Sequence, residues 1–314
     1  MRDRSRGSLV GEMLDYHFGY SAAGPSRRGK RLRPRLLFAV AQEAGAPPLA
    51  ATGAAVAVEL LHNYSLIHDD IEDGDRLRHG RETLWVKYGA PQAINAGDAL
   101  CALSFLALAD ADGHPPERVC AMVERLHAAH FEMCKGQSLD MAFELEADIR
   151  SDRYLEMIAG KTAALFAVSC ELGALCAGAS QEQTASYRAL GAAFGMAFQM
   201  YDDVLGIWAD TEATGKARGA DIERRKKTYP VVWALEHGEG TARERVAGAF
   251  ADNGEIGPAA RDAVIAALEE LGAREAALRS AANHLAVVER APHGRVRDFL
   301  LSLLPVSPED RLRT

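Results

Sequence analysis

The stretch ELLHNYSLIHDDIED at residues 59–73 places a group of acids directly after an apolar run. The apolar residues recur at helical spacing, which predicts a helix over residues 50–70. Continued by one turn, that helix carries Asp69 and Asp73 on the same face, with Asp70 beside them. Unpaired carboxylates at this spacing repel one another, so we expect a cation there. Mg²⁺ is the natural choice, because it takes oxygen ligands and is commonly held by one or two carboxylates plus substrate phosphates.

A second acidic pair favours this metal site over the alternative, a solvated acidic helix end. Asp202 and Asp203, in QMYDDVLG at 199–206, also follow a strongly apolar run. Two such helix ends can face each other across a helical bundle, where metal sites are built from inward carboxylates. They would repel strongly unless Mg²⁺ and an anionic ligand lay between them.

Basic residues near the acidic motifs indicate an anionic ligand. GKRLRP at 29–34 holds three cations within five residues, and Lys161 stands in the otherwise apolar stretch AGKTAALF. The other cations are Arg76, Arg78 and Arg81 after the first acidic motif, and Lys216, Lys226 and Lys227 after the second. Each of these others, taken alone, is more often a solvated surface charge. Together with the acid pairs they suggest a polyphosphate, held through Mg²⁺ on one side and through Lys and Arg on the other.

The rest of the chain predicts an all-α protein. Its 314 residues are 48% hydrophobic and 25% charged, an ordinary globular mixture. No segment alternates with a period of two for long enough to suggest a sheet. Apolar spacing predicts about ten helices in one domain over residues 1–314. The predicted helices cover residues 35–45, 50–70, 91–110, 116–146, 151–179, 183–209, 228–238, 242–252, 258–272, 273–289 and 294–304.

Composition also limits the partners and the location. The formal net charge of -8 argues against nucleic acid as the main partner. The five cysteines, without a C-x-x-C spacing, favour buried, reduced thiols in a cytoplasmic protein. The N-terminal segment lacks the apolar core of a signal peptide. We find no stretch of about 18 apolar residues, so we expect no transmembrane segment.

The order of these motifs resembles the trans-isoprenyl diphosphate synthases, the polyprenyl synthetase family. A lone DDxxD would be a weak signal, but the ordered set, over about residues 28–231, is strong. The set is GKRLRP at 29–34, ELLHNYSLIHDDIED at 59–73, GDAL at 97–100, GQSLD at 136–140, GKTAALF at 160–166, FQMYDDVLG at 198–206, and TGK…D…KKTYP from 214 to 230. The resemblance implies a large helical bundle around a central cavity, and a homodimer.

The resemblance also implies roles for single residues. Asp69 and Asp73 would be the main Mg²⁺ ligands of the first motif, with Asp70 supporting. Asp202 would hold the third of three Mg²⁺ ions, with Asp203 beside it. The allylic diphosphate would contact Arg78, Lys161, Thr162, Gln199, Lys216 and Lys226. The diphosphate of isopentenyl diphosphate would contact Lys30, Arg33, His62 and the position of His79.

The implied reaction joins isopentenyl diphosphate head to tail with dimethylallyl, geranyl or farnesyl diphosphate. Mg²⁺ and the cations would neutralise the leaving diphosphate and so ease cleavage of the allylic C–O bond. A dry apolar cavity would keep the carbocation from water. No side chain stands out as the base for the final proton loss, and the resemblance suggests that the departing diphosphate serves.

Two residues before the first aspartate motif bear on product length. The family places bulky length-determining residues a few positions before that motif, where Tyr64 and Ser65 stand here. One aromatic with a small neighbour favours a C20 product, geranylgeranyl diphosphate, with C15 next. The alternative is that Tyr64 is ordinary core, because a helical wheel puts it roughly 140° from Asp69.

Three positions depart from the family pattern. His79 replaces the second arginine after the first motif, which weakens or rearranges the isopentenyl site, and Arg81 is a candidate to compensate. Gly206 replaces the third acid of the second motif, with a modest effect expected. Arg28 replaces the first glycine of GGKR.

Two alternative functions stay open. A class I terpene cyclase on the same fold would need no second diphosphate; Lys30, Arg33 and His62 argue against it, whereas His79 argues weakly for it. A non-catalytic partner subunit of a heteromeric synthase would be expected to lose acidic ligands, but the first motif is complete. We therefore expect an active synthase.

Overall fold

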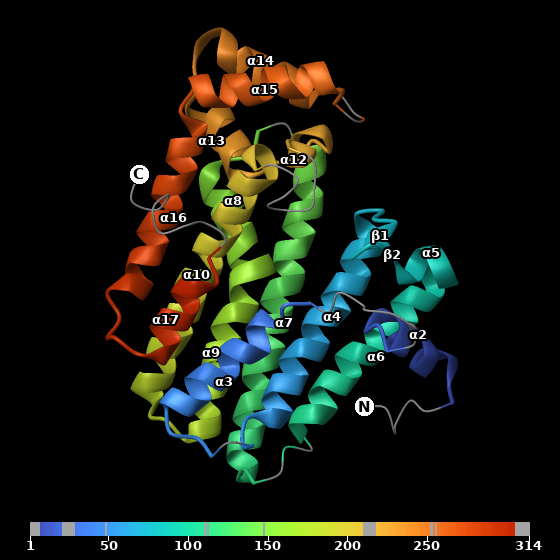
Figure 1. Ribbon diagram of the computed structural model, residues 1–314, viewed down its shortest axis with the longest axis vertical. Coiled ribbons are helices and arrows are strands. Elements are labelled where there is room, and N and C mark those ends of the chain that lie inside the picture. Colours follow the sequence, from blue (N-terminus) through green and yellow to red (C-terminus); the bar gives the residue numbers. More distant parts are fainter. Residues whose placement is uncertain are drawn as a thin grey trace. The chain divides into compact units, whose positions relative to one another are not determined.

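The computed structural model of the protein is predominantly helical (Figure 1). It describes residues 7–20, 29–47, 49–109, 111, 113–146, 148–209, 218–251, 254 and 256–304. The helices are α2 (Leu9–His17), α3 (Leu32–Glu43), α4 (Thr52–Glu72), α5 (Leu84–Tyr88), α6 (Ala90–Ala109), α7 (Pro116–Leu145), α8 (Ser151–Ile158), the π-helical turn η1 (Ala159–Ala163), α9 (Ala164–Ala177), α10 (Gln181–Trp208), α12 (Ala220–Glu223), α13 (Tyr229–His237), α14 (Gly240–Ala251), α15 (Pro258–Glu270), α16 (Ala273–Glu289) and α17 (Arg295–Ser302). The strands in these ranges, β1 (Leu77–Arg78) and β2 (Arg81–Glu82), form one antiparallel hairpin.

The all-α prediction is confirmed, and each predicted helix has an observed counterpart. Three short helices escaped prediction: α2, α5 and α12 have nine, five and four residues. The segment predicted as one helix over residues 151–179 is interrupted at η1. Such π-helical turns inside helices are frequently found at functional sites.

The chain separates into two compact units. The first comprises Met1–His127 and Glu171–Thr184, and the second comprises Ala128–Cys170 and Ala185–Thr314. Each division falls within a helix, namely α7, α9 or α10. The single domain over residues 1–314 and its central cavity stay predictions.

In the first unit, α4 and α6 run side by side (Figure 1). Their buried residues share an apolar cluster with α2 and α5, which contains Met13, Leu14, Leu60, Ile67, Leu84, Ala93, Ala96 and Leu100. Burial of this apolar surface fixes the orientation of α4 about its axis. The acids of the first motif therefore emerge at a defined helix end.

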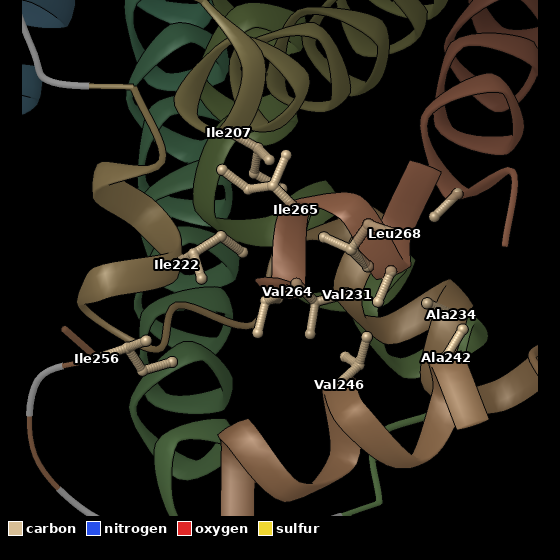
Figure 2. Close-up of a cluster of buried hydrophobic side chains, with 12 residues drawn as sticks. Ile207, Ile222, Val231, Ala234, Ala242, Val246, Ile256, Val264, Ile265 and Leu268 are labelled. Carbon is tan, nitrogen blue, oxygen red and sulfur yellow. The ribbon is translucent and has the colours of Figure 1, made fainter. Parts of the chain in front are cut away.

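In the second unit, a separate cluster joins α10, α12, α13, α14 and α15 (Figure 2). Ile222 of α12 is fully buried there, together with Ile207 of α10 and Ile265 of α15. A helix of four residues has little stability of its own. These apolar contacts therefore hold α12 next to the end of α10.

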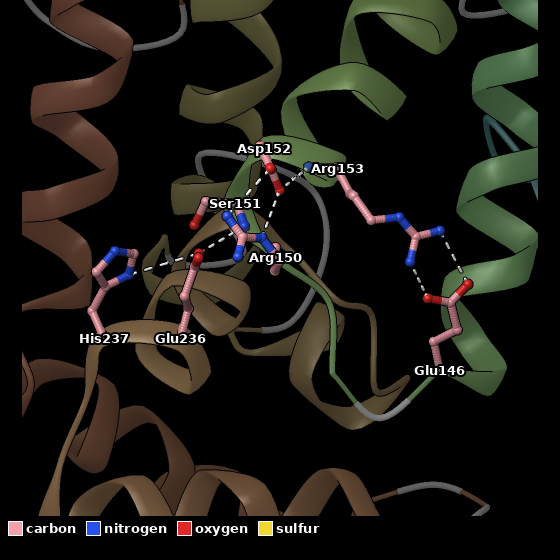
Figure 3. Close-up of polar contacts among 7 residues, drawn as sticks. All are labelled: Glu146, Arg150, Ser151, Asp152, Arg153, Glu236 and His237. Atoms are coloured by element: carbon pink, nitrogen blue, oxygen red, sulfur yellow. Dashed lines mark hydrogen bonds and ion pairs between the residues drawn. The ribbon is translucent and has the colours of Figure 1, made fainter.

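Polar contacts fix the start of α8 (Figure 3). The guanidinium of Arg153 pairs with the carboxylate of Glu146, with 3.2 Å between Nη2 and Oε1. The backbone N–H of Ser151 donates to Oε2 of Glu236 on α13 at 2.7 Å. Ion pairs near the surface contribute only about 0–1 kcal/mol each. The two contacts, one ion pair and one hydrogen bond, mainly orient the turn that presents Tyr154.

Two glycines of the quoted motifs allow α7 to touch the π-helical turn. A Cβ atom on Gly136 would lie 2.1 Å from the backbone nitrogen of Lys161 and 2.7 Å from the carbonyl oxygen of Met157. A Cβ on Gly160 would lie 2.5 Å from the carbonyl oxygen of Glu132. Such distances exclude any side chain at either position, so backbone packs on backbone here.

Gly136→Ala is expected to destabilise the protein by about 1–3 kcal/mol, because overpacking forces backbone shifts. Equilibrium unfolding in denaturant measures this loss. Gly248→Ala is the matched control, since Gly248 is exposed in α14 and a Cβ there meets nothing within 4 Å. Alanine is the better helix former, so this control should gain up to about 1 kcal/mol. Equal effects of the two substitutions would contradict the packing role of Gly136.

The cysteines are free thiols, but not all are buried. Cys170 and Cys176 are buried and Cys101 is half-buried, whereas Cys120 and Cys134 are exposed. Burial raises the pKa of the Cys176 thiol to about 11, which keeps it protonated. The expectation of buried thiols was therefore wrong for Cys120 and Cys134, which lie on outward positions of α7.

Among the described helices, two are long and apolar enough to cross a membrane by length and composition alone. Their best windows, in Ala90–Ala109 and Ser151–Ala177, have mean hydropathies of 1.3 and 1.4. The expectation that no such stretch exists was therefore wrong. In Ser151–Ala177, 78% of the apolar segment is buried inside the protein, as in the core helix of a soluble protein. In Ala90–Ala109, 33% of the apolar segment is buried. This evidence for a membrane span is weak, and the absence of a transmembrane segment stays a prediction.

Candidate active site

The first acidic motif forms the C-terminal end of α4. Asp69 is half-buried and Asp73 is exposed one turn later, where its N–H donates to the Asp69 carbonyl at 2.8 Å. Asp70 is 2% exposed, and its Oδ1 accepts Nε of Arg78 at 2.8 Å and pairs with Nη2 at 2.7 Å. Burial raises the pKa of Asp70, and the Arg78 guanidinium opposes this rise. Asp70 thus holds Arg78, while Asp73 remains open to solvent.

The hairpin after this motif places His79 at its tip. His79 and Gly80 have φ angles of 53° and 79°, so both lie in the left-handed region, as in a type I′ turn. His79 is exposed there. Arg81, the candidate to compensate for the missing arginine, donates to the carbonyl oxygens of Tyr16 and His17 at 2.9 and 3.1 Å. Its guanidinium therefore binds the C-terminal end of α2.

Two histidines lie close to the cations of the first unit. Nε2 of His62 is 3.1 Å from Nη1 of Arg33, and a guanidinium can only donate, so the imidazole accepts and is neutral. Burial, and then the positive charge of Arg33, holds the pKa of His62 well below its usual range. His17, on α2, lies 2.9 Å from Oδ1 of Asn63, and burial lowers its pKa to about 4. His62 is thus a neutral partner of Arg33, and His17 was missed because nothing in its local sequence marks it.

The second acidic motif lies on α10, in the second unit. Asp202 is exposed, whereas Asp203 is 1% exposed. Asp203 accepts hydrogen bonds from Nε2 of Gln199 at 3.0 Å, from the backbone N–H of Tyr229 at 2.9 Å and from the hydroxyl of Tyr154. Burial raises the pKa of Asp203 to about 6, although these hydrogen bonds lower it. Two adjacent aspartates therefore have different environments, one open to solvent and one held by the protein.

The π-helical turn carries two of the predicted diphosphate ligands. Nζ of Lys161 pairs with Oδ2 of Asp140, the last residue of the GQSLD motif. The hydroxyl of Thr162 donates to Oε1 of Gln199 at 2.7 Å, and Gln199 in turn bonds Asp203. The structure thus joins Thr162 and Gln199 to Asp203 of the second acidic motif, while Lys161 pairs with Asp140 of another quoted motif.

Lys226 lies among carboxylates of the same unit. Burial lowers its pKa, but the negative charges of Asp203, Asp221, Asp140 and Asp202 outweigh burial and raise it above its ordinary value. Lys226 therefore stays charged through the physiological pH range. Asp140 and Asp221 stand in the quoted family motifs but had no predicted role, and sequence reasoning missed Tyr154 as a member of this cluster.

The remaining predicted residues are placed as follows. Lys30 is exposed just before α3. Lys216 and Arg28 lie outside the described residues. The predicted residues divide between the two units, so the facing arrangement of the two acidic motifs stays a prediction.

The donor set fits Mg²⁺ in both motifs. Carboxylate oxygens are the ligands that this hard cation prefers. Asp70 and Asp203 are engaged by protein donors, whereas Asp73 and Asp202 are exposed. Within the described residues no three metal-ligating side chains form a complete site by themselves. The number of ions stays a prediction.

Comparisons with known proteins decide the family. A family model described as Polyprenyl synthetase matches residues 18–268. The chain belongs to the polyprenyl synthetase family. The (2E,6E)-farnesyl diphosphate synthase of Mycobacterium tuberculosis is 42% identical over 282 residues, which cover 87% of this chain and 77% of that protein. The geranylgeranyl diphosphate synthase of the same organism is 42% identical over 242 residues, 75% of this chain and 68% of that protein.

Solved structures agree with this membership. A polyprenyl synthetase from Streptomyces coelicolor superposes with a TM-score of 0.86 at 34% identity, covering 96% of this chain and 92% of that one. The resemblance inferred from the ordered motifs is therefore confirmed. This polyprenyl synthetase is an enzyme, a prenyltransferase, and the cyclase and partner-subunit alternatives are not favoured.

Proposed function

We propose that this polyprenyl synthetase condenses isopentenyl diphosphate with an allylic diphosphate and releases geranylgeranyl diphosphate. The observation that carries the proposal is the cluster in the second unit, where the exposed Asp202 accompanies Lys161 and Lys226. An exposed carboxylate beside cationic side chains is suited to a diphosphate that is about to leave. The farnesyl and geranylgeranyl synthases among the relatives support the substrate class.

The side chains divide the work of binding and orientation. Asp69, Asp73 and Asp202 would hold Mg²⁺, which would supply charge that stabilises the leaving diphosphate. Lys161 and Lys226 add positive charge next to the second motif. Gln199 donates to Asp203 and accepts the hydroxyl of Thr162, so these two hydrogen bonds orient Gln199 and Thr162.

Isopentenyl diphosphate is expected at the cations of the first unit. Burial lowers the pKa of Arg33 to about 10, which leaves it charged at neutral pH. The neutral His62 accepts from Arg33 and orients its guanidinium without adding charge of its own. Lys30 and the position of His79 complete the proposed set.

One incubation tests the function. The enzyme receives Mg²⁺, isopentenyl diphosphate and, separately, dimethylallyl, geranyl or farnesyl diphosphate. Mass spectrometry of the dephosphorylated products should show linear prenyl alcohols longer than the primer. Cyclic hydrocarbons formed without isopentenyl diphosphate would indicate a cyclase, and no product from any primer would contradict the proposal.

The C20 product rests on the residues just before the first acidic motif. Tyr64 packs against the apolar cluster of the first unit, and its ring centroid lies 4.7 Å from that of His68 on the same helix. Ser65 lies on the helix face of Asp69, four residues before it, and its hydroxyl donates to the carbonyl of His62 at 2.9 Å. A larger side chain at position 65 would therefore lie directly below Asp69, along the same face of the helix.

Ser65→Phe is expected to shorten the product, because a larger side chain on the face of Asp69 excludes the growing chain. Tyr64→Ala is expected to lengthen it if Tyr64 closes the cavity. Chromatography of the dephosphorylated products measures both shifts. Wild-type product length in both variants would place the floor elsewhere. A destabilised Tyr64→Ala enzyme with unchanged product would mark Tyr64 as core only.

His79→Arg is expected to lower the KM for isopentenyl diphosphate about tenfold at pH 8, the effect of one charged hydrogen bond. An unperturbed histidine is charged only near or below about pH 6.5, whereas arginine is always charged. The KM for the allylic substrate serves as the internal control and should hardly change. An unchanged or raised isopentenyl KM would remove this role of position 79.

A homodimer and a cytoplasmic location complete the proposal. Helix α6 exposes Ile94 and Leu106, which are 44% and 39% accessible, and exposed apolar side chains are common where a partner subunit packs. A second copy of the chain is the partner that we propose for it. Light scattering of the purified enzyme distinguishes a dimer from the 33.8 kDa monomer.

A further inference from the structure

His17 is held between α2, α4 and the β1–β2 hairpin. Arg81 of the hairpin donates to the carbonyl oxygens of Tyr16 and His17, so the backbone at the end of α2 is fixed to the hairpin. The Arg81 guanidinium and Nζ of Lys87 also lie 5.4 and 3.7 Å from the centroid of the Tyr16 ring. With α2 held in this way, Nε2 of His17 lies 2.9 Å from Oδ1 of Asn63 on α4.

The contact with Asn63 determines which nitrogen of the neutral imidazole carries the hydrogen. Nδ2 of Asn63 lies 2.8 Å from the carbonyl oxygen of Glu59, and a carbonyl oxygen only accepts, so the orientation of the amide is fixed. Oδ1 of Asn63 is therefore an acceptor, and Nε2 of His17 is its donor. Nδ1 of His17 then carries a lone pair, and it becomes a second donor only when the ring takes up a proton.

Positive side chains surround this imidazole. Burial lowers the pKa of His17, the hydrogen bond to Asn63 opposes this, and positive neighbours lower it further, to about 4. The neighbours with this effect on the hairpin are Arg78, Arg81 and His79. On α4, burial lowers the pKa of His62, and the charges of Arg33, Arg78 and His17 lower it further. His17 and His62 thus belong to one electropositive group in the first unit.

The acids of the neighbouring helices act on other residues. Glu59 of α4 raises the pKa of Arg33 against the effect of burial. Asp98 of α6 has its Oδ1 3.7 Å from Nε2 of His68. The partner of the His17 ring is a neutral amide and not a carboxylate. An anion that enters this group is therefore drawn to positive charge that these acids leave uncompensated.

We propose that His17, contributed by α2, is a further binding residue for the diphosphate of isopentenyl diphosphate, and that it acts in its protonated form. The proposal rests on the proposed function, because that function places this diphosphate beside Arg33 and His62. The negative charge of the ligand favours the imidazolium, which takes its proton from solvent. Nε2 then keeps its hydrogen bond to Asn63, and Nδ1 donates to a phosphate oxygen.

This role explains what Arg81 does at a site where His79 stands in place of an arginine. Arg81 does not replace the missing charge, because its guanidinium binds the carbonyl oxygens at the end of α2. It holds His17 instead, and His17 supplies a positive charge when the anion binds. Binding of isopentenyl diphosphate is consequently coupled to the uptake of a proton.

The coupling gives the pH dependence a definite sign. The pKa of His17 is about 4 in the free protein, and the ligand raises it. Between the free and the bound pKa, the complex holds a proton that the free protein lacks, so affinity rises as the pH falls. A bound pKa near or above the ordinary value of about 6.5 places this rise between about pH 8 and pH 6.

His17→Gln tests the proposal, because a glutamine amide keeps a donor for Asn63 but has no ring to protonate. Calorimetric titration with isopentenyl diphosphate, without an allylic substrate, measures binding free of turnover. At about pH 6 the variant should bind about tenfold more weakly than the wild type, the effect of one charged hydrogen bond. At about pH 8.5 the two should bind nearly equally. Ionisation of the ligand affects both proteins alike and cancels in the comparison.

His237→Gln is the matched control, because it removes an exposed histidine of the second unit. It should leave the affinity unchanged at both pH values. Equal weakening of His17→Gln at both pH values would make the role of His17 structural and overturn the proposal, as would wild-type affinity at about pH 6. If His17→Gln fails to fold, wild-type titrations in two buffers of different ionisation enthalpy decide: binding without proton uptake overturns the proposal.

Inorganic pyrophosphate, as a second probe, separates this inference from the proposed function. If the synthesis incubation gives no product while pyrophosphate binding keeps the dependence on His17, the proposed function fails and the anion site stands. A wild type that forms product, but whose binding of both probes is the same in His17→Gln, keeps the proposed function and overturns the inference.

Discussion

Asp69→Ala and Asp202→Ala are each expected to reduce turnover by about two to three orders of magnitude while helix content is retained. Removing one preorganised stabiliser of the developing charge typically costs about 10²–10³ in rate. Asp202 is exposed, so its truncation removes a side chain from the surface and not from the core. Asp69 is half-buried, and its carbonyl hydrogen bond to Asp73 survives the change of side chain. The loss should therefore be catalytic and not structural.

Steady-state rates with Mg²⁺ restored after chelation, together with circular dichroism, measure the two effects. Asp262→Ala is the control, because Asp262 is an exposed aspartate that pairs with Arg261 on the surface. It should keep wild-type turnover. Near-wild-type rates in both acidic-motif variants would show that neither aspartate serves the metal. Loss of helix content would make the rate loss structural in origin.

The long helices could be predicted because their apolar residues recur over several turns. Helix α12 could not, since four residues show no period, and its position depends on Ile222 meeting residues of α10 and α15. The π-helical turn was missed for another reason. Its residues AGKTA continue an apolar helical pattern. The contact between this turn and Gly136 on α7 is visible only in the folded protein.

The candidate site could be predicted where one helix face carries the pattern, as for Asp69 and Asp73. It could not be predicted where the partners come from distant segments. Tyr154 and Asp203 are 49 residues apart, and no spacing rule connects them. The surroundings of Gly206 could not be predicted either, because only the structure shows that a Cβ atom there would lie 2.1 Å from Oδ2 of Asp221.

Asp203→Ala is expected to destabilise the protein by about 3–5 kcal/mol, the usual cost of removing one partner from a buried charged pair. Asp203 is 1% exposed and accepts from Gln199, Tyr154 and the backbone of Tyr229. Its truncation leaves these donors without an acceptor and removes a negative charge close to Lys226. Hydrogen-bonding groups left unsatisfied in the interior each cost about 1–3 kcal/mol.

Asp202→Ala is the matched comparison, because it removes the same side chain one residue earlier on the same helix. Asp202 is exposed, and surface substitutions usually change stability by less than about 0.5 kcal/mol. Equilibrium unfolding in denaturant, without Mg²⁺ or diphosphate, should therefore separate the two variants by several kcal/mol. Asp203→Asn should fall between them, since an amide keeps one acceptor oxygen but turns a donor toward its neighbours. Equal stability of Asp202→Ala and Asp203→Ala would mean that the hydrogen bonds to Asp203 do not hold this part of the site together.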